Sequence, residues 1–297
     1  MTGAERGFLL LCSHMGDPER EVLSVSRFRQ LMAKGAAMEK PDSQRELNLG
    51  DLTRLGVGRT EGEQILRLLD QEQLLENYLN RAQFLDCFPM TRASEAYPLP
   101  LRQKLGPECP ACLWVKGDVT LLDRPLISLV GSRDLYPENE VFARYVGYQA
   151  ALQGYVLVSG NARGADRTAQ QACLRAGGQV ISVVADRLDS HPLTERVLWL
   201  AEDSYDLDFS AKRALSRNRI IHALTPITLV AQCRAGRGGT WSGTVHNLRH
   251  RWSKVYVFRD GSEAERQLCG LGATAVETDD LTSFQTLCTQ EQLRFCK

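Results

Sequence analysis

The stretch 158-VSGNARGADRTA-169 changes from a strand pattern to a helix pattern within a few residues. It begins as the end of the apolar run "YVLVSG" (155–160) and continues into the amphipathic run "DRTAQQACLRAGG" (166–178). Two glycines, an arginine and an aspartate stand in the turn between them. A strand that leads directly into a helix is typical of a parallel α/β sheet, where ligands collect at the carboxyl ends of the strands.

The same alternation continues on both sides of this stretch. Apolar runs predict strands at 126–133, 155–160, 179–185, 227–232 and 254–258, and residues 264–277 predict a helix followed by a last short strand. Amphipathic runs between them predict helices at 138–153, 166–178, 217–224 and 241–252. Continuous apolar strands alternating with helices indicate a Rossmann-like, doubly wound, mostly parallel sheet in an α/β protein.

The first ninety residues have a different pattern. Apolar residues recur there at three- and four-residue spacing, and "LGVGRTEGEQIL" (55–66) has the Gly-x-Gly turn of a helix-hairpin-helix module. We expect a small all-α domain of the helix-hairpin-helix or SAM-like type at 1–90, followed by a proline-rich linker at 91–112. Residues 113–297 then form the Rossmann-like domain.

The charge of the chain is balanced overall but unevenly distributed. The 36 basic and 36 acidic residues cancel, yet no acidic residue occurs between Asp208 and Asp260. That segment contains ten basic residues: Lys212, Arg213, Arg217, Arg219, Arg234, Arg237, Arg249, Arg251, Lys254 and Arg259. Such a segment favours a surface that binds anions.

Composition also argues against several classes of protein. No apolar run is long enough to span a bilayer, and the N-terminal "FLLLC" is too short for a signal peptide, so we expect a cytoplasmic protein without a membrane role. The nine cysteines do not suggest a disulfide framework, and "CPAC" (109–112) lacks a second ligand pair for zinc. We expect neither a metal nor a cofactor.

Three turns at strand ends contain the candidate binding residues. Glycine lets a phosphate approach the backbone, helix N-terminal amides attract anions, and arginine contributes bidentate contacts. The candidates are Gly131, Ser132 and Arg133 in the first turn, Ser159, Gly160, Arg163, Gly164 and Asp166 in the second, and Arg237, Gly239 and Thr240 in the third. We expect Arg163 to be a cationic arm and Asp166 to serve as an N-cap that holds the loop.

In order and spacing, "VGSR", "SGNARGADRTAQQACLRAGG" and "RNRII" resemble the motifs of the DNA-processing protein A (DprA/Smf) family. The resemblance covers roughly residues 60–288 and adds Arg217, Asn218 and Arg219 to the candidate walls of the pocket. It implies a non-enzymatic protein that binds single-stranded DNA without sequence preference, forms homodimers and loads a RecA-type recombinase. It also implies that residues 113–297 are the nucleic-acid-binding domain, and we expect no C-terminal winged helix after it. A role in recombination, or in a defence or toxin–antitoxin locus, is open.

Several positions depart from the family pattern. The family usually has Phe-Pro, whose Phe can stack on a base, where this chain has Ala214 and Leu215. The stacking energy of about 1–3 kcal/mol per base is therefore not expected from that position. A proline turn near the third strand reads His191-Pro192, and "GRGGTWSGTV" (236–245) introduces Trp241. These departures mark a divergent member.

Two other functions compete with DNA binding. The lonely-guy type phosphoribohydrolases of the same superfamily use a glutamate where this chain has Gly243, although Asp166 or Asp186 could lie nearby in space. A sensor that binds a mononucleotide without turning it over would use the same glycine-rich turns. A Gly-x-Gly-x-x-Gly dinucleotide site and a serine nucleophile are both unsupported, because neither the spacing nor a nearby histidine is present.

Overall fold

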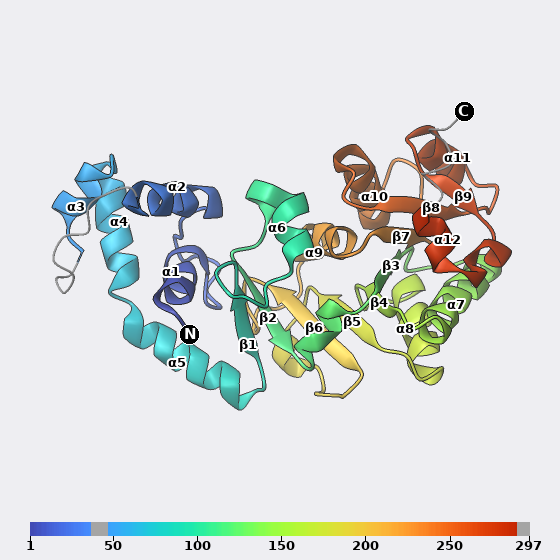
Figure 1. Cartoon of the computed structure of the whole chain (residues 1–297), viewed down its shortest axis with the longest axis horizontal. Coiled ribbons are helices and arrows are strands. Elements are labelled where there is room, and N and C mark those ends of the chain that lie inside the picture. Colours follow the sequence, from blue (N-terminus) through green and yellow to red (C-terminus); the bar gives the residue numbers. More distant parts are fainter. Residues whose placement is uncertain (37–46, 290–297) are drawn as a thin grey trace.

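The structure is a computed structural model that describes residues 1–36 and 47–289 (Figure 1). Its described residues form one sheet of nine strands in the order β1-β2-β6-β5-β4-β3-β7-β8-β9. The strands are β1 (Phe88–Thr91), β2 (Cys112–Lys116), β3 (Leu126–Val130), β4 (Val156–Ser159), β5 (Val180–Val184), β6 (Val197–Glu202), β7 (Ile227–Val230), β8 (Lys254–Phe258) and β9 (Thr274–Val276).

The seven strands from β6 to β9 in this order pair with one another in parallel. After β3 the chain builds outward through β4, β5 and β6 on one side, and then through β7, β8 and β9 on the other. The order therefore reverses between β3 and β7, which makes their carboxyl ends a topological switch point. Every residue of β3, β4, β5 and β7 is buried, as the continuous apolar runs predict. The predicted doubly wound, mostly parallel sheet is confirmed.

One edge of the sheet is antiparallel. β2 pairs with β6, so that Trp114 stands opposite Ala201, and β1 pairs with β2. The sequence pattern did not predict β1, β2 or β6 as strands. Their pairing depends on partners far away in the chain, and no local periodicity reports such partners.

Helices cover both faces of the sheet (Figure 1). α7 (Pro137–Leu152) and α8 (Ala165–Arg175) lie in one hydrophobic cluster, and α9 (Ala211–Leu224) lies in the other. The remaining helices of this part of the chain are α6 (Leu99–Leu105), α10 (Gly239–His250), α11 (Glu263–Gly270) and α12 (Phe284–Thr289). The α7–α8 contact is close: a Cβ at Gly147 would lie 2.0 Å from the Ala169 carbonyl oxygen.

The N-terminal part contains α1 (Gly3–Cys12), α2 (Val25–Ala36), α3 (Leu49–Arg54), α4 (Arg59–Leu69) and α5 (Glu72–Phe84). The predicted tight turn separates α3 from α4, with Gly56 at φ +76°. α5 contacts the sheet through Tyr78, whose ring lies 5.3 Å from Trp114 of β2 and 4.6 Å from Tyr205. The expected linker at 91–112 includes α6. The division at 90 and 112 stays a prediction.

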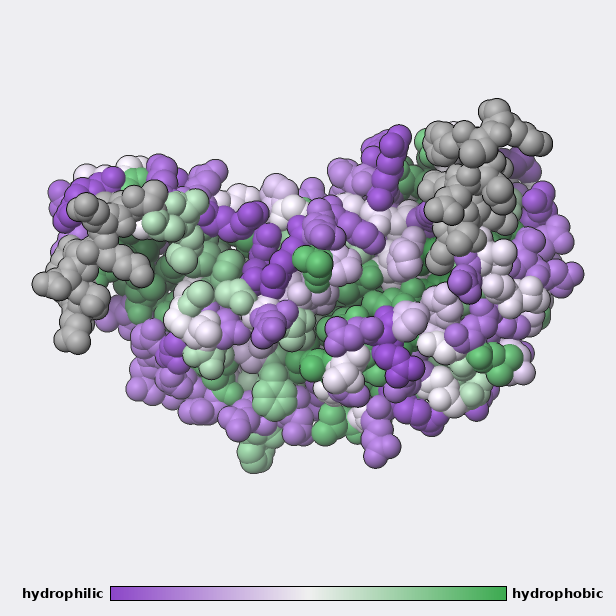
Figure 2. Space-filling model, in the orientation of Figure 1, coloured by the Kyte–Doolittle hydropathy of each residue, from purple (hydrophilic) through white to green (hydrophobic). Residues whose placement is uncertain are grey.

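The space-filling view shows polar side chains over most of this face, with apolar patches between them (Figure 2). None of the helices in the described part of the chain is long and apolar enough to cross a membrane.

Candidate nucleic-acid interface

Two adjoining pockets open at the carboxyl ends of the central strands. Their volumes are about 410 Å³ and 460 Å³, and they share Arg133, Ala162 and Arg217. The first pocket lies at the switch point between the β3 and β7 turns. It is lined by Gly131, Ser132, Arg133, Asp134, Asp166, Arg217, Asn218, Arg234, Arg237, Gly239 and Thr240, among others. The second lies over the β4–α8 turn and includes Gly160, Arg163, Arg167, Asp186 and Phe209.

The β4–α8 turn owes its shape to Gly164. This residue has φ +84° and is the N-cap of α8, with no side-chain hydrogen bond to the helix. A Cβ there would lie 2.3 Å from the Ser132 carbonyl oxygen, so the turn packs against the β3–α7 turn backbone to backbone. Asn161 also adopts positive φ (+55°), which asparagine tolerates better than most residues. These two positions bring the first and second predicted turns together.

Asp166 anchors this turn, although not as an N-cap. The prediction of an N-cap is wrong, because Gly164 takes that position and Asp166 follows inside the first turn of α8. Its buried carboxylate accepts a hydrogen bond from the Ala162 backbone amide at 3.3 Å. Burial raises the pKa of Asp166, while the positive charge of Arg217 opposes that rise.

Arg217 is the most enclosed cation of the site. Only 7% of it is exposed, and its Nη1 donates to the Val183 carbonyl oxygen at 2.9 Å. Its Nε is buried without a hydrogen-bond partner among the described residues. Burial lowers the pKa of Arg217, and the carboxylates of Asp166 and Asp186 act in the opposite direction. Arg217 lines both pockets, and a guanidinium held at a pocket wall is suited to an anion such as phosphate.

Gly160 creates the space that Arg217 occupies. A Cβ on Gly160 would lie 1.4 Å from Arg217 Nη1. The glycine of the "SGNARG" stretch is therefore required by the guanidinium approaching from α9. The sequence alone indicated only a steric or phosphate-binding role for this glycine.

The other arginines of the two pockets are exposed at the surface. Arg163 pairs with Asp134 at 2.6 Å, with more than half of each side chain exposed. Arg133 lies over the Phe209 ring at 5.9 Å. Arg234 and Arg237 stand on the turn before α10. Exposed side chains of this kind can move onto a ligand, because each holds at most one surface ion pair of small energy.

Several candidates have a structural role in the site, and one of them lies outside both pockets. Ser159 is fully buried in β4 and lines neither pocket. The Thr240 hydroxyl donates to the Gly131 carbonyl oxygen at 2.9 Å, and Asn218 Nδ2 donates to the Gly239 carbonyl oxygen at 3.2 Å. The Ser132 amide donates to Gln232. These bonds hold the first and third turns and α9 in register.

Arg219 lies outside the two pockets, and the expectation that it forms a wall of them is corrected. Its guanidinium forms an ion pair with Glu202 of β6, and its Nε donates to the Glu108 carbonyl oxygen at 3.1 Å. Arg213 likewise donates to the carbonyl oxygens of Ala185, Leu207 and Asp208. Helical periodicity explains the difference, since Arg217 and Arg219 are two positions apart on α9 and face different directions.

Phe209 is the functional candidate that the sequence did not reveal. It precedes α9, is 56% exposed, and lines the second pocket beside Arg133. Leu215, where the family has its Phe-Pro, is 53% exposed on the rim of the first pocket. Trp241 is partly buried and packs against the hydrophobic core. An aromatic residue at the start of the acid-free, basic segment 209–259 is the sequence signal that would have indicated Phe209.

His222 forms the floor of the first pocket and couples folding to pH. It is buried, and its Nδ1 lies 3.2 Å from Thr228 Oγ1. Burial lowers its pKa from 6.5 to about 3. In the unfolded chain His222 therefore binds a proton below about pH 6.5, whereas in the folded chain it does so only below about pH 3. His222 stabilises the fold above pH 6.5, and this contribution is lost as the pH falls through that window.

We expect His222→Asn to reduce the difference in unfolding free energy between pH 7 and pH 4.5. Denaturant unfolding at both pH values measures this, with the exposed His250→Asn as the control. The assignment fails if the His222 variant loses as much stability on acidification as the wild type does.

Comparisons with known proteins find relatives of this chain. A sequence model of the family "DNA recombination-mediator protein A" matches residues 89–284. "DNA processing protein DprA" of Bacillus subtilis is 29% identical over 170 residues, which cover 53% of this chain and 56% of that protein. The protein of the same name from Streptococcus pneumoniae is 30% identical over 48% of this chain and 49% of its own length. The alignments thus span about half the length of these relatives.

Two solved structures share the fold. The DNA processing protein A of Streptococcus pneumoniae superimposes with a TM-score of 0.71 at 23% identity, over 97% of this chain and 98% of that one. The Helicobacter pylori protein, solved for its single-stranded DNA binding mode, superimposes with a TM-score of 0.55 at 22% identity, over 69% of this chain and 95% of that one. Since the family model covers well over half of the chain, including all three turns, the protein belongs to the DNA recombination-mediator protein A family.

Proposed function

We propose that the two pockets bind the phosphates of single-stranded DNA without reading its sequence, and that the protein acts in DNA processing or recombination. The observation that carries the proposal is Arg217, a largely buried guanidinium that lines both pockets at the switch point of the sheet. Exposed Arg133, Arg163 and Arg237 surround it. Cations along two connected pockets suit a polymer of phosphates better than one isolated phosphate.

An exposed aromatic ring supports the proposed preference for single strands. Phe209 is exposed beside the arginines and offers a surface for an unstacked base. A duplex keeps its bases stacked inside and cannot use that ring. The structure of the Helicobacter pylori protein was solved for its single-stranded DNA binding mode, which supports the same assignment.

We propose binding without catalysis, and nucleotide hydrolysis is the second candidate. Asp166 lines the first pocket with a raised pKa, a property of general acids. Its carboxylate, however, already accepts the Ala162 amide and lies within the field of Arg217, which fits a structural anchor. A pocket of about 410 Å³ also has room for a mononucleotide. The binding experiment distinguishes these cases.

Fluorescence anisotropy with labelled single- and double-stranded oligonucleotides, at two salt concentrations, tests the proposal. We expect tight, salt-sensitive binding of the single strand, with nucleoside monophosphates competing weakly. Full displacement by one monophosphate, or release of free base from it, would establish the nucleotide function instead.

Arg133→Glu tests the assignment of the pockets themselves. It is expected to lower the affinity for single-stranded DNA by about tenfold or more. The slope of the logarithm of the binding constant against the logarithm of the salt concentration should become shallower by about 0.7 for each phosphate that the variant no longer neutralises. Arg175→Glu, on the exposed side of α8, is the matched charge reversal and is expected to change little. Equal effects of the two variants would remove the pocket from the proposal.

We further propose that the protein works as a homodimer and delivers DNA to a RecA-type recombinase in the cytoplasm, as its family membership suggests. Sedimentation velocity tests the dimer, and pull-down with a purified RecA-type recombinase tests the partner.

A further inference from the structure

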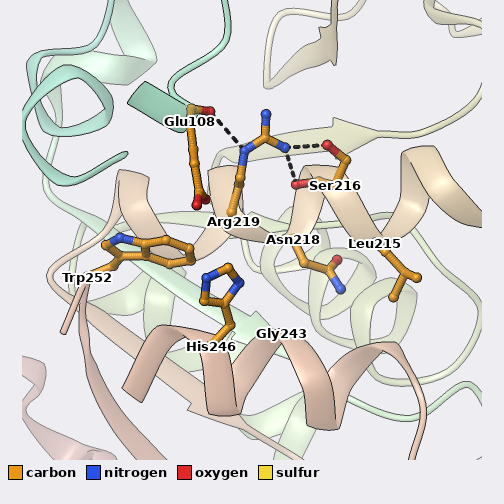
Figure 3. Close-up of a pocket in the computed structure, with 8 residues that line it drawn as sticks. All are labelled: Glu108, Leu215, Ser216, Asn218, Arg219, Gly243, His246 and Trp252. Carbon is orange, nitrogen blue, oxygen red and sulfur yellow. Dashed lines mark hydrogen bonds between the residues drawn. The ribbon is translucent and has the colours of Figure 1, made fainter. Parts of the chain in front are cut away.

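A third pocket of about 380 Å³ lies between α9 and α10 (Figure 3). It adjoins the first of the two pockets proposed to bind phosphates, which are called the phosphate pockets below. It is lined by Glu108, Leu215, Ser216, Asn218, Arg219, Gly243, His246 and Trp252. Leu215 and Asn218 also line the first phosphate pocket, so the two cavities meet along one edge of α9. A strand held by Arg217 therefore has a direct route over Leu215 into this third pocket.

The chemistry of the third pocket is unlike that of the phosphate pockets. Its one arginine, Arg219, is neutralised by Glu202 and donates to Ser216 and to the Glu108 carbonyl. The Glu108 carboxylate is exposed and makes no hydrogen bond or ion pair with any other described residue. An unpaired carboxylate repels a phosphate and accepts hydrogen bonds from amino groups.

An imidazole held by aromatic neighbours forms one side of the pocket. The His246 ring lies 4.7 Å from Trp252 and 4.3 Å from His250, and Figure 3 shows it rising from α10 toward Glu108 and Arg219. Trp252 is buried and fixes the ring in place. Burial lowers the pKa of His246, although the nearby Glu108 carboxylate opposes this shift, and the net lowering favours the neutral ring. A flat, neutral, oriented ring is a surface for stacking.

We propose that this pocket binds a nucleobase of the bound strand, stacked on His246, and that Glu108 accepts a hydrogen bond from its exocyclic amino group. The inference rests on the proposed function and adds a base preference to it. The Asn218 Oδ1 accepts no hydrogen bond from the described residues, although its Nδ2 is used, and offers a second acceptor. Cytosine, adenine and guanine carry the amino group, whereas thymine does not. The volume is at the lower end for ligand pockets, which suits one base.

The test compares the affinities for length-matched oligo-dC and oligo-dT at neutral pH, by the same anisotropy titration. We expect the wild type to bind oligo-dC about two- to tenfold more tightly, the ratio that one hydrogen bond contributes. Glu108→Met keeps the side-chain length, removes the acceptor and should bring the ratio to one. Glu95→Met, on an exposed glutamate of the preceding segment, should preserve it.

His246→Ala is expected to weaken the binding of both oligonucleotides about fivefold or more because the stacking surface is removed. His250 also packs on Trp252 but does not line the pocket, so His250→Ala should have a smaller effect. Arg133→Glu should weaken both oligonucleotides equally and leave their ratio unchanged.

The outcomes separate the two proposals. Equal wild-type affinities for oligo-dC and oligo-dT, or an unchanged ratio in Glu108→Met, overturn the base pocket while strand binding itself stands. Binding of neither oligonucleotide overturns the proposed function and the base pocket together.

Discussion

Replacing Arg217 by methionine is expected to lower the affinity for single-stranded DNA by roughly 10- to 150-fold, the largest loss among single substitutions in the pockets. A hydrogen bond to a charged group contributes about 1.5–3 kcal/mol, and Arg217 is the one cation shared by both pockets that is held in place by burial. Arg133 is also shared, but it is exposed and loses side-chain entropy on binding.

Anisotropy titration of Arg217→Met and Arg217→Lys measures this loss. Lysine keeps the charge and loses the planar fork, so an intermediate affinity is expected. Arg175→Met is the control for the removal of a surface cation. Methionine removes the positive charge beside the buried Asp166 carboxylate and is expected to lower stability, so denaturant unfolding must first show that the variant is folded under the titration conditions. A folded Arg217→Met protein with wild-type affinity would show that the phosphate does not reach α9.

Replacing Gly164 by alanine is expected to destabilise the fold by about 2–6 kcal/mol, the sum of backbone strain and overpacking. At φ +84° an alanine is strained, and its Cβ would meet the carbonyl oxygens of Ser132 and Arg133 at 2.3 and 2.5 Å. Neither oxygen belongs to a flexible side chain, so the β3–α7 and β4–α8 turns would have to separate. DNA binding should fall with stability, since both turns line the site.

Gly177→Ala separates strain from collision. Gly177 lies just after α8, has the same φ of +84°, and has no atom within 4 Å of the position of a Cβ. Only the backbone strain of about 1–2 kcal/mol is expected there. Denaturant unfolding of the two variants measures the difference. If both substitutions cost the same, the close contact between the turns does not exist in solution.

The sequence by itself determined the parallel part of the sheet. A strand that is buried on both faces needs apolar residues at nearly every position, so the apolar runs at 126–133, 155–160 and 227–232 identify such strands from local composition alone. It also determined the carboxyl-edge location of the site, because glycine-rich turns after parallel strands meet at one edge whatever the strand order.

Only the tertiary structure decided what each side chain does at that edge. Asp166 became a loop anchor inside α8, and Arg217 and Arg219, two residues apart, became a pocket cation and a structural ion pair. Phe209 entered the site from a loop, and β1, β2 and β6 joined the sheet through distant partners. Direction, burial and pairing depend on residues far away in the chain, so no local pattern contains them. The sequence named the kinds of residue at the site, and packing assigned their roles.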